Sequence, residues 1–348
     1  MRLVMTLLVR DEQELLAANL DYHLRQGVDF VLVSDHGSTD ATPDILADYV
    51  NRGLARVLPV EGEAKDQGTW VTRMARLAAA EHEADWVLNN DADEFWWPLA
   101  GTLKDMLGLI PPRYGQLAVP RHNFIARAGA GPFWERMVIR ETRSQNLVGR
   151  ELEPNAIHRG HPEVVVELGN HWVRGPGLAP APALPLIEVF HFPIRTWEQF
   201  EHKVAREGRG LLALRDRDPD VGRDALTLYE LHRRGDLADY FAQSILDEQR
   251  IEAGVARGEL VLDRRLERFL SAEGEATDTG PQLVAVSRLA GEAFALAEKL
   301  AGSEEALGDT QRRLDEVSRK LQVLRDSRLV RWTAPLRAAY YRARRERS

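Results

Sequence analysis

Short apolar runs and helical segments alternate along the first ninety residues, and this alternation most restricts the possible folds. The apolar runs cover residues 3–9, 30–33, 57–60 and 86–88, and helical patterns separate them. Strands that are each followed by a helix form parallel sheets with helices on both faces. The sequence therefore predicts an α/β domain with a mostly parallel sheet, and such sheets bind their ligands at the carboxyl ends of the strands.

The composition of the chain argues against several kinds of partner and site. The 348 residues carry a net charge of −8, which argues against nucleic acid as the main partner. The chain has no cysteine, so disulfides and thiolate metal sites are excluded, and a reducing compartment fits. The apolar segment 1–9 runs directly into charged residues, so we expect a first strand and not a signal peptide. No uncharged run approaches the length of a membrane span.

Two aspartates follow the fourth apolar run. Asp91 and Asp93 stand two positions apart, so side chains leaving a strand end there point in roughly the same direction. Two carboxylates a few ångströms apart repel each other by about 4 kcal/mol at an effective dielectric near 20. A divalent cation removes that cost, and oxygen ligands suit Mg²⁺ or Mn²⁺. Similar acid pairs in 216–220 lie in a charged, proline-containing stretch that predicts a solvated turn.

Polar side chains also follow the first two predicted strands. Arg10, Asp11 and Glu12 come directly after the first strand, and the segment 34–40 comes after the second. Each group alone is compatible with a turn or a helix cap, and Asp11 with Glu14 has the spacing of a capping box. Together with the aspartates after the fourth strand, they predict a ligand site along one edge of the sheet.

The second half of the chain has a different pattern. Short extended runs in 117–192 alternate with glycine and proline turns, and the segments 197–214 and 225–253 indicate helices. Leucines then recur every seven residues, at Leu300, Leu307, Leu314 and Leu321. This spacing predicts a coiled-coil-like helix over residues 281–325 that could mediate self-association. A helix packed on its own domain is the alternative.

The C-terminal segment is basic and amphipathic. Residues 325–348 contain eight arginines against two acids, interleaved with apolar and aromatic side chains. Such a segment suits an anionic membrane surface or an acidic partner. The alternative is a solvated helix end. We therefore treat residues 326–348 as a separate basic amphipathic tail.

Four motifs resemble those of GT-A glycosyltransferases, close to glycosyltransferase family 2 and to a bacterial branch with an Asp-x-Asp-Glu-Phe motif. They are Leu8–Glu12, Ser34–Asp40, Asp91–Phe95 and His191–Arg195. In the second motif, His36 stands where family members commonly have an aspartate. The resemblance covers residues 1–215 and implies a GT-A domain there, with a Rossmann-like sheet and with residues 216–272 as a helical region packed on it.

The resemblance implies a hexosyltransferase-type enzyme that uses a nucleotide-sugar donor and Mn²⁺ or Mg²⁺. The acceptor would be a glycan or a lipid-linked molecule in bacterial surface polysaccharide synthesis. Asp91, Asp93 and a late histidine, His191 or His171, would hold the metal. The side chains that would bind the nucleotide sugar are Arg10, Asp11, Glu12, Asp35, Asp40, Lys65 and Asp91.

Family 2 enzymes usually invert the anomeric centre, which requires a carboxylate to accept the proton of the acceptor hydroxyl. The candidates for this base are Glu94, Glu151 and Glu188. Trp96, Trp97 and Trp134 could stack on a sugar ring or belong to the core.

Two other functions fit parts of the pattern. A nucleotidyltransferase also uses paired acids and a nucleotide, but its phosphate loop is usually rich in glycine, and the segment 8–12 lacks glycine. A non-catalytic sugar-nucleotide-binding scaffold, organised by the coiled coil, is the second alternative. We expect a cytoplasmic protein whose basic tail lies at the inner face of the plasma membrane.

Overall fold

The computed structural model describes residues 1–60, 67–146, 149–213, 222–271, 280–301 and 310–325. The chain forms two compact units, and each unit collects separate stretches of the sequence. The first contains Met1–Arg121, Glu153–Phe190 and Glu273–Ser348, and the second contains His122–Leu152 and His191–Ala272. The segments expected from the sequence were consecutive, at 1–215, 216–272, 281–325 and 326–348, and their role as domains stays a prediction.

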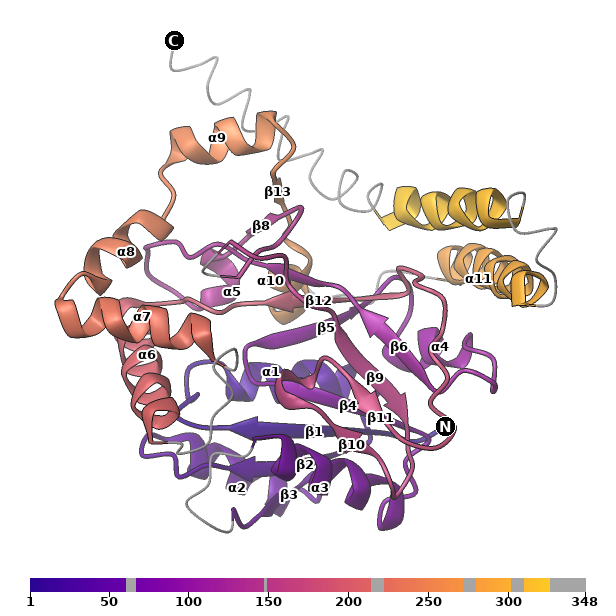
Figure 1. Cartoon of the computed structure of the whole chain (residues 1–348), viewed down its shortest axis with the longest axis horizontal. Coiled ribbons are helices and arrows are strands. Elements are labelled where there is room, and N and C mark those ends of the chain that lie inside the picture. Colours follow the sequence, from indigo (N-terminus) through magenta and orange to yellow (C-terminus); the bar gives the residue numbers. More distant parts are fainter. Residues whose placement is uncertain (61–66, 147–148, 214–221, 272–279, 302–309, 326–348) are drawn as a thin grey trace. The chain divides into compact units, whose positions relative to one another are not determined.

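The first unit is built on a six-stranded sheet of order β3-β2-β1-β4-β9-β6 (Figure 1). The four strands from the first ninety residues run parallel: β1 (Leu3–Val9), β2 (Phe30–Asp35), β3 (Ala55–Leu58) and β4 (Trp86–Asp91). β9 (Asn155–Arg159) pairs antiparallel with both β4 and β6 (Gln116–Val119). The predicted α/β class with a mostly parallel sheet is therefore confirmed.

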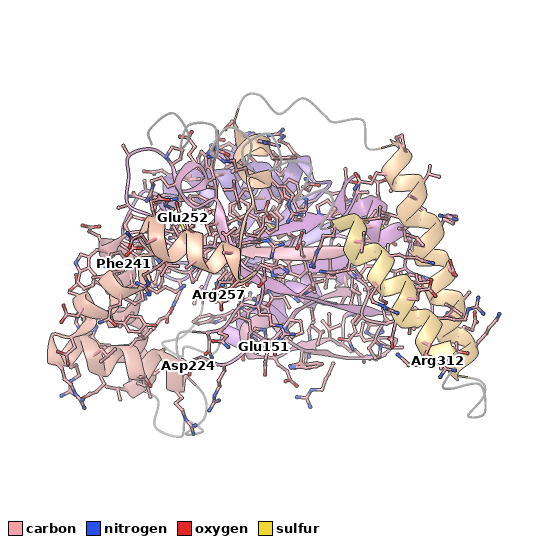
Figure 2. All side chains as sticks on the ribbon, turned by 90° about the horizontal axis from the view of Figure 1, so that it is seen from above. Glu151, Asp224, Phe241, Glu252, Arg257 and Arg312 are labelled. Atoms are coloured by element: carbon pink, nitrogen blue, oxygen red, sulfur yellow. The ribbon has the colours of Figure 1, made fainter. Side chains whose placement is uncertain are left out.

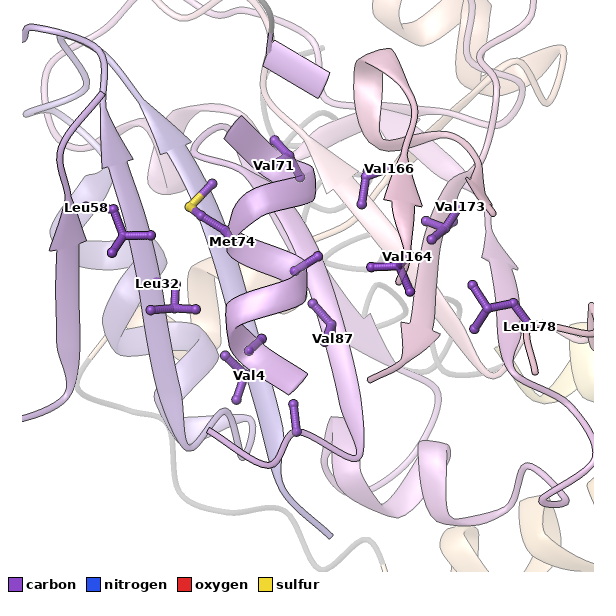
Figure 3. Close-up of a cluster of buried hydrophobic side chains, with 14 residues drawn as sticks. Val4, Leu32, Leu58, Val71, Met74, Val87, Val164, Val166, Val173 and Leu178 are labelled. Carbon is purple, nitrogen blue, oxygen red and sulfur yellow. The ribbon is translucent and has the colours of Figure 1, made fainter. Parts of the chain in front are cut away.

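Three helices connect the parallel strands: α1 (Leu16–Arg25), α2 (Thr42–Asn51) and α3 (Gln67–Ala80). The buried face of α3 packs on alternate residues of the strands, among them Val4, Leu32 and Val87, as Figure 3 shows. On the other face of β1, Leu3, Met5 and Leu7 are also completely buried. Burial on both faces explains why the strands read as continuous apolar runs.

Smaller elements complete the first unit. β5 (Glu94–Pro98) follows β4 after a two-residue turn, and all but the last residue of β12 (Ile187–His191) also belongs to this unit. The helix α4 (Leu103–Gly108) begins with a capping box between Thr102 and Asp105. A short hairpin joins β10 (Val165–Val166) to β11 (Val173–Arg174), and the 3₁₀ turn η1 (Leu168–Asn170) lies in its loop.

The second unit contains helices and one short strand pair. β8 (Ile139–Glu141) pairs antiparallel with β13 (Leu260–Leu262). Its helices are α5 (Phe133–Arg136), α6 (Trp197–Leu212), α7 (Arg223–Arg234), α8 (Leu237–Ser244), α9 (Glu248–Ala256) and α10 (Arg265–Leu270), and the last four of these lie in the range 216–272 that was expected to be helical. Phe200 and Val204 on α6 and Leu228 on α7 belong to one apolar cluster.

The C-terminal region is helical, but it is not the single coiled-coil-like helix expected over 281–325. Helix α11 (Gly280–Ala301) ends within this range, and a second helix covers residues 310–325 beside it (Figures 1 and 2). Val317 and Leu321 are buried within the first unit, so the leucine repeat reflects packing on the chain itself. The expectation that this repeat mediates self-association stays a prediction. Leu307 lies outside the described residues.

Contacts within the first unit fix both C-terminal helices. Arg113 lies 3.2 Å from the carboxylate of Glu298 on α11. At the end of the other helix, the guanidinium of Arg325 lies 3.8 Å from the buried carboxylate of Glu188. Among the described helices, none combines the length and apolar character needed to cross a membrane. The tail 326–348 lies outside the described residues, so its predicted membrane contact stays a prediction.

Candidate functional site

An acidic turn connects the carboxyl end of β4 to β5. Asp91 is the last residue of β4, Ala92 and Asp93 form the turn, and Glu94 is the first residue of β5. Asp91 is half-buried, whereas Asp93 is 5% exposed and Glu94 is completely buried. We call Asp91, Asp93 and Glu94 the acidic turn. It stands at the strand end where the sequence predicted a ligand site.

A network of buried hydrogen bonds holds the acidic turn in place. The side-chain amide of Asn19 on α1 donates to the carbonyl of Ala92 at 2.9 Å and to that of Glu94 at 2.7 Å. Asn90 donates to the side-chain oxygen of Asn19 at 3.1 Å. His23 holds this arrangement in turn, because its Nδ1 donates to the backbone oxygen of Asn19 at 2.8 Å. The conformation of the turn is therefore fixed by side chains of a neighbouring helix.

The protonation state of His23 follows from its surroundings. Its Nε2 accepts the backbone N–H of Trp96 at 3.3 Å, so the proton of the neutral ring lies on Nδ1. Complete burial lowers the pKa of His23 to about 4. The histidine is thus a neutral structural residue at physiological pH.

Glu94 is held by two side chains. Arg121 lies 3.4 Å from one of its carboxylate oxygens, and the amide of Asn155 donates to the other. Burial, together with the charges of Asp91 and Asp93, raises the pKa of Glu94 to about 8, while Arg121 opposes this shift. The two aspartates thus add to the effect of burial in disfavouring ionisation of Glu94.

Asn170 reaches the acidic turn from a distant part of the chain. Its Nδ2 donates to Oδ1 of Asp91 at 3.1 Å, and the side chain is 1% exposed. The residue has a φ of 62°, in the left-handed region that non-glycine residues rarely adopt. Our sequence reasoning missed Asn170. The adjacent pair Gly169-Asn170 was the available signal, since both residue types tolerate left-handed turns.

His171 follows in the same loop. Burial lowers its pKa to about 4, and the positive charge of Arg121 lowers it as well, against a hydrogen bond to the backbone of Pro154. A neutral histidine can act as a metal ligand. Within the described residues, however, no group of three or more histidine, aspartate or glutamate side chains is arranged to hold a metal.

The loops after β1 and β2 are tied to each other. Oδ1 of Asp35 accepts from the N–H and the hydroxyl of Ser38 at 2.9 and 2.7 Å. Oδ1 of Asp11 accepts the backbone N–H of Thr39 at 2.7 Å, and the Asp11 N–H donates to Ser38. Arg10 lies 3.6 Å from Oδ2 of Asp11. The structure therefore brings the residues predicted for nucleoside binding together and gives two of them a role in bracing the loops.

Asp40 extends this bracing. Its two oxygens accept the backbone N–H groups of Gln13 at 3.0 Å and Thr42 at 2.9 Å. The N–H of Glu12 donates to the hydroxyl of Thr42 at 2.9 Å. Lys65, the predicted phosphate ligand, lies outside the described residues.

The three candidate bases have different environments. Glu94 is completely buried in the acidic turn. Glu188 on β12 is 3% exposed and faces Arg325. Glu151 belongs to the second unit and is exposed (Figure 2). His191, a predicted metal ligand, also belongs to the second unit, where its Nδ1 lies 2.8 Å from the side-chain oxygen of Asn123. Metal binding by His191 stays a prediction.

Two of the tryptophans considered for sugar stacking are core residues. Trp96 is 0% exposed and Trp97 is 4% exposed. The Nε1 of Trp96 donates to Asn90 at 2.9 Å, and the ring of Trp97 stacks on Phe190. Of the two alternatives given for these tryptophans, burial in the core therefore describes both. Trp134, in the second unit, is half-buried.

The sequence was compared with protein families, curated proteins and solved structures. Residues 5–176 match the model of glycosyltransferase family 92. The likeness to family 2 is not confirmed. The search of curated proteins finds no match.

The solved structures that the chain resembles include glycosyltransferases. S. aureus TarS 1-349 in complex with UDP-GlcNAc has 13% identity, 85% of this chain and 92% of that chain covered, and a TM-score of 0.37. The mannosyltransferase PcManGT from Pyrobaculum calidifontis in complex with GDP-Man and Mn²⁺ is 14% identical in sequence, with a TM-score of 0.33. The match covers 94% of this chain and 87% of that chain. Glucosyl-3-phosphoglycerate synthase from Mycobacterium tuberculosis is 20% identical in sequence, with a TM-score of 0.25. The match covers 34% of this chain and 44% of that chain. Such low scores carry no inference about the chemistry of this chain.

The family match extends from β1 to β11 and includes the acidic turn, Asn170 and the two braced loops. The functional residues discussed above thus lie, for the most part, inside the matched stretch. Residues 5–176, just under half of the chain, are thus similar to glycosyltransferase family 92.

Proposed function

We propose that the chain is a metal-dependent, inverting hexosyltransferase that moves a sugar from a nucleotide-diphosphate donor to a glycan or lipid-linked acceptor. The observation that carries this proposal is the acidic turn. Three acids share one turn at the carboxyl end of a central strand, and the pKa of Glu94 is raised to about 8, by burial and by Asp91 and Asp93. This turn lies inside the stretch that matches a glycosyltransferase family.

The acidic turn fits a divalent cation in its chemistry. Mg²⁺ commonly binds to one or two carboxylates and completes its coordination with water and substrate phosphates. Asp91 and Asp93 would supply those carboxylates, and Oδ1 of Asn170 is a buried acceptor without a hydrogen-bond partner beside Asp91. When bound, Mg²⁺ or Mn²⁺ would neutralise the charge that develops on a diphosphate leaving group.

The protein residues around the turn have positioning roles in this proposal. Asn19 fixes the backbone of the turn, and Asn170 fixes the carboxylate of Asp91. The braced loops that contain Arg10, Asp11, Glu12, Asp35 and Asp40 would form the wall of the nucleoside pocket, and Lys65 would contact a phosphate. Because these loops are hydrogen-bonded to each other, little conformational entropy is lost when a donor binds.

The proton of the acceptor hydroxyl needs a base. Glu94 has a pKa of about 8 and is mostly protonated at neutral pH, so it is a poor base there. Glu188 is buried against Arg325. Glu151 is the exposed member of the three and belongs to the second unit, and its role as the base stays a prediction.

A thermal-shift screen tests the proposal. UDP-, GDP-, dTDP- and CMP-sugars are added to the purified protein with Mn²⁺ or with EDTA. We expect one nucleotide class to raise the melting temperature in the presence of Mn²⁺, and this shift to be lost in Asp91→Asn and Asp93→Asn. The exposed Asp239→Asn on α8 is the matched control and should keep the shift. A donor shift that persists in EDTA, or in both site variants, would overturn the metal role.

The basic tail gives a second, separable part of the proposal. Deleting residues 326–348 should leave donor hydrolysis unchanged, because the acidic turn lies elsewhere in the chain. The deletion should reduce co-sedimentation with vesicles that contain anionic phospholipid, since the removed segment carries seven of the chain's arginines. Unchanged co-sedimentation would remove the membrane contact and leave the enzymatic proposal intact.

A further inference from the structure

One face of the β10–β11 hairpin is exposed and carries an unusual set of side chains. Val165 pairs with Arg174, and Val166 pairs with Val173. The next pair in this register is Glu167 with Trp172, whose backbone N–H and carbonyl are bonded at 2.9 Å. Residues opposite each other in a hairpin, and residues two apart along a strand, share a face. Val165, Glu167, Trp172 and Arg174 therefore lie on one face of the hairpin.

Burial confirms this alternation. Val166 and Val173 are 2% and 3% exposed and belong to the apolar cluster with α3 (Figure 3). On the opposite face, Val165 is 40% exposed and Trp172 is 53% exposed. Trp172 is the one tryptophan of the exposed class among the described residues. Leaving such a large apolar ring in water forgoes the free energy of its burial, so a binding partner is the natural explanation.

This face borders a groove. Val165, Glu167 and Arg174 line it on the hairpin side, and Arg73 and Arg76 line it on α3. The groove has a volume of about 700 Å³, within the range of ligand sites. Glu167 is the single acid among its lining residues and is paired with Arg174 at 2.7 Å, so the lining carries excess positive charge. A partner with negative charge is favoured.

The hairpin loop also connects this face to the acidic turn. Trp172 shares a hairpin face with Arg174, which lines the groove, whereas Asn170, two residues before Trp172, binds Asp91. A molecule seated on Trp172 therefore contacts the same six-residue loop that positions the acid. This continuity distinguishes the groove from an unrelated basic surface patch.

We propose that this face binds the saccharide acceptor, with Trp172 stacking on a sugar ring and Arg174 and Arg73 facing an anionic group of the acceptor chain. The inference rests on the proposed glycosyltransferase function and adds the class of its acceptor. A sugar ring offers a face of C–H groups that packs on an aromatic ring, while its hydroxyls stay in water. The arginines select among saccharides for those that carry carboxylate or phosphate groups.

Binding measurements with three probes test the proposal. Oligogalacturonate is an anionic saccharide, a malto-oligosaccharide is a neutral one, and polyglutamate is anionic without sugar rings. We expect the intact protein to bind oligogalacturonate best. Trp172→Ala should lower the affinity for both saccharides by about tenfold. Trp172→Tyr should keep most of the affinity because it retains an aromatic ring. Arg174→Gln should weaken oligogalacturonate and leave the malto-oligosaccharide unchanged.

The controls separate this inference from the proposed function. Leu212→Ala removes an apolar side chain that is 60% exposed in the second unit, and it should bind all probes like the original chain. The nucleotide-sugar thermal shift should persist in every Trp172 variant. If the original chain shows no such shift, the proposed glycosyltransferase function is contradicted, whereas saccharide binding in the groove is tested separately by the three probes. Three results would each overturn the acceptor site. They are saccharide binding that is undiminished in Trp172→Ala, polyglutamate binding as tight as that of oligogalacturonate, and no saccharide binding at all.

Discussion

Asn170 donates a hydrogen bond to Asp91 at 3.1 Å across 79 positions of sequence. The bond joins a residue in an unfavourable backbone conformation, with φ at 62°, to the acid that ends β4. A left-handed non-glycine residue persists only where the surrounding structure compensates for its cost of about 1–2 kcal/mol. The contact to Asp91 and the burial of the Asn170 side chain provide that compensation.

Replacing Asn170 with glycine should separate the two roles of this residue. Glycine adopts the same φ without strain but has no amide, so Asn170→Gly leaves Asp91 without its donor. Removing a residue that orients a metal ligand typically lowers metal affinity by about 10–100-fold. We expect a loss of this size in a Mn²⁺ titration, together with a melting temperature close to that of the original chain.

The variant Asn170→Ala provides the comparison. It loses the same amide and also places a Cβ in the left-handed region, so it should lower the free energy of unfolding by about 1 kcal/mol more than Asn170→Gly. Equal Mn²⁺ affinity in the original chain and Asn170→Gly would show that the amide does not position Asp91 for metal binding.

Glu94 should make stability depend on pH. Its pKa rises from 4.5 to about 8 in the folded protein, so the folded state binds more protons than the unfolded state between these values. The free energy of unfolding therefore contains a contribution that is present below pH 4.5 and is lost as the pH rises through about 8. Denaturant unfolding at several pH values should show a decrease of about 3 kcal/mol from pH 5 to pH 8 that Glu94→Gln removes.

His23 and His158 act in the opposite direction and can be distinguished from Glu94. Burial lowers the pKa of each to about 4, so they destabilise the fold as the pH falls from 6.5 toward 4. Their effect is the same in the original chain and in Glu94→Gln. Parallel pH profiles of these two proteins would contradict the raised pKa of Glu94.

Asn19 should be a sensitive position for stability. Asn19→Ala leaves the carbonyls of Ala92 and Glu94 without their side-chain donor in a buried region. Each buried polar group that loses its partner costs about 1–3 kcal/mol. We expect a decrease of about 2–4 kcal/mol in the free energy of unfolding, measured by urea titration. A change below 1 kcal/mol would mean that the turn relaxes to find other partners.

The pair of Glu188 and Arg325 should anchor the C-terminal helix. Their side chains are 4% and 12% exposed, so Arg325→Met removes a positive charge that lies beside a buried carboxylate. Breaking one side of a buried ion pair costs about 3–5 kcal/mol. Urea unfolding of Arg325→Met should show a loss in this range.

The double variant Glu188→Gln with Arg325→Met is the control, because it removes both charges. Its free energy of unfolding should recover most of the loss, since replacing a whole buried pair is often close to neutral. A double variant that is no more stable than Arg325→Met would show that packing, and not charge, dominates at this position.

The sequence predicted those parts of the fold that depend on local patterns. The parallel strands β1 to β4 were found because each apolar run lies between helical segments. The antiparallel strands β9 and β6 were not placed, because their pairing joins short segments that carry no local signal of their partner. The leucine repeat before residue 325 correctly indicated helix, but an apolar stripe does not reveal which surface it will contact.

The same limit applies to the candidate site. The apolar run before Asp91 placed the acidic turn, since a buried strand must end where its charges begin. The capping box expected for Asp11 is wrong: α1 begins at Leu16 without a side-chain cap, and Asp11 has a φ of 53° and accepts from Thr39 instead. Asn170 and Arg121 escaped detection because their contacts with the acids come from distant parts of the chain.

The order of synthesis gives the Glu188–Arg325 contact a consequence for folding in the cell. The ribosome makes β12 long before the C-terminal helix, so Arg325 can reach Glu188 only when translation is almost finished. Final closure of the first unit therefore waits for the last part of the chain, and premature termination before residue 325 would release a product prone to chaperone capture and proteolysis.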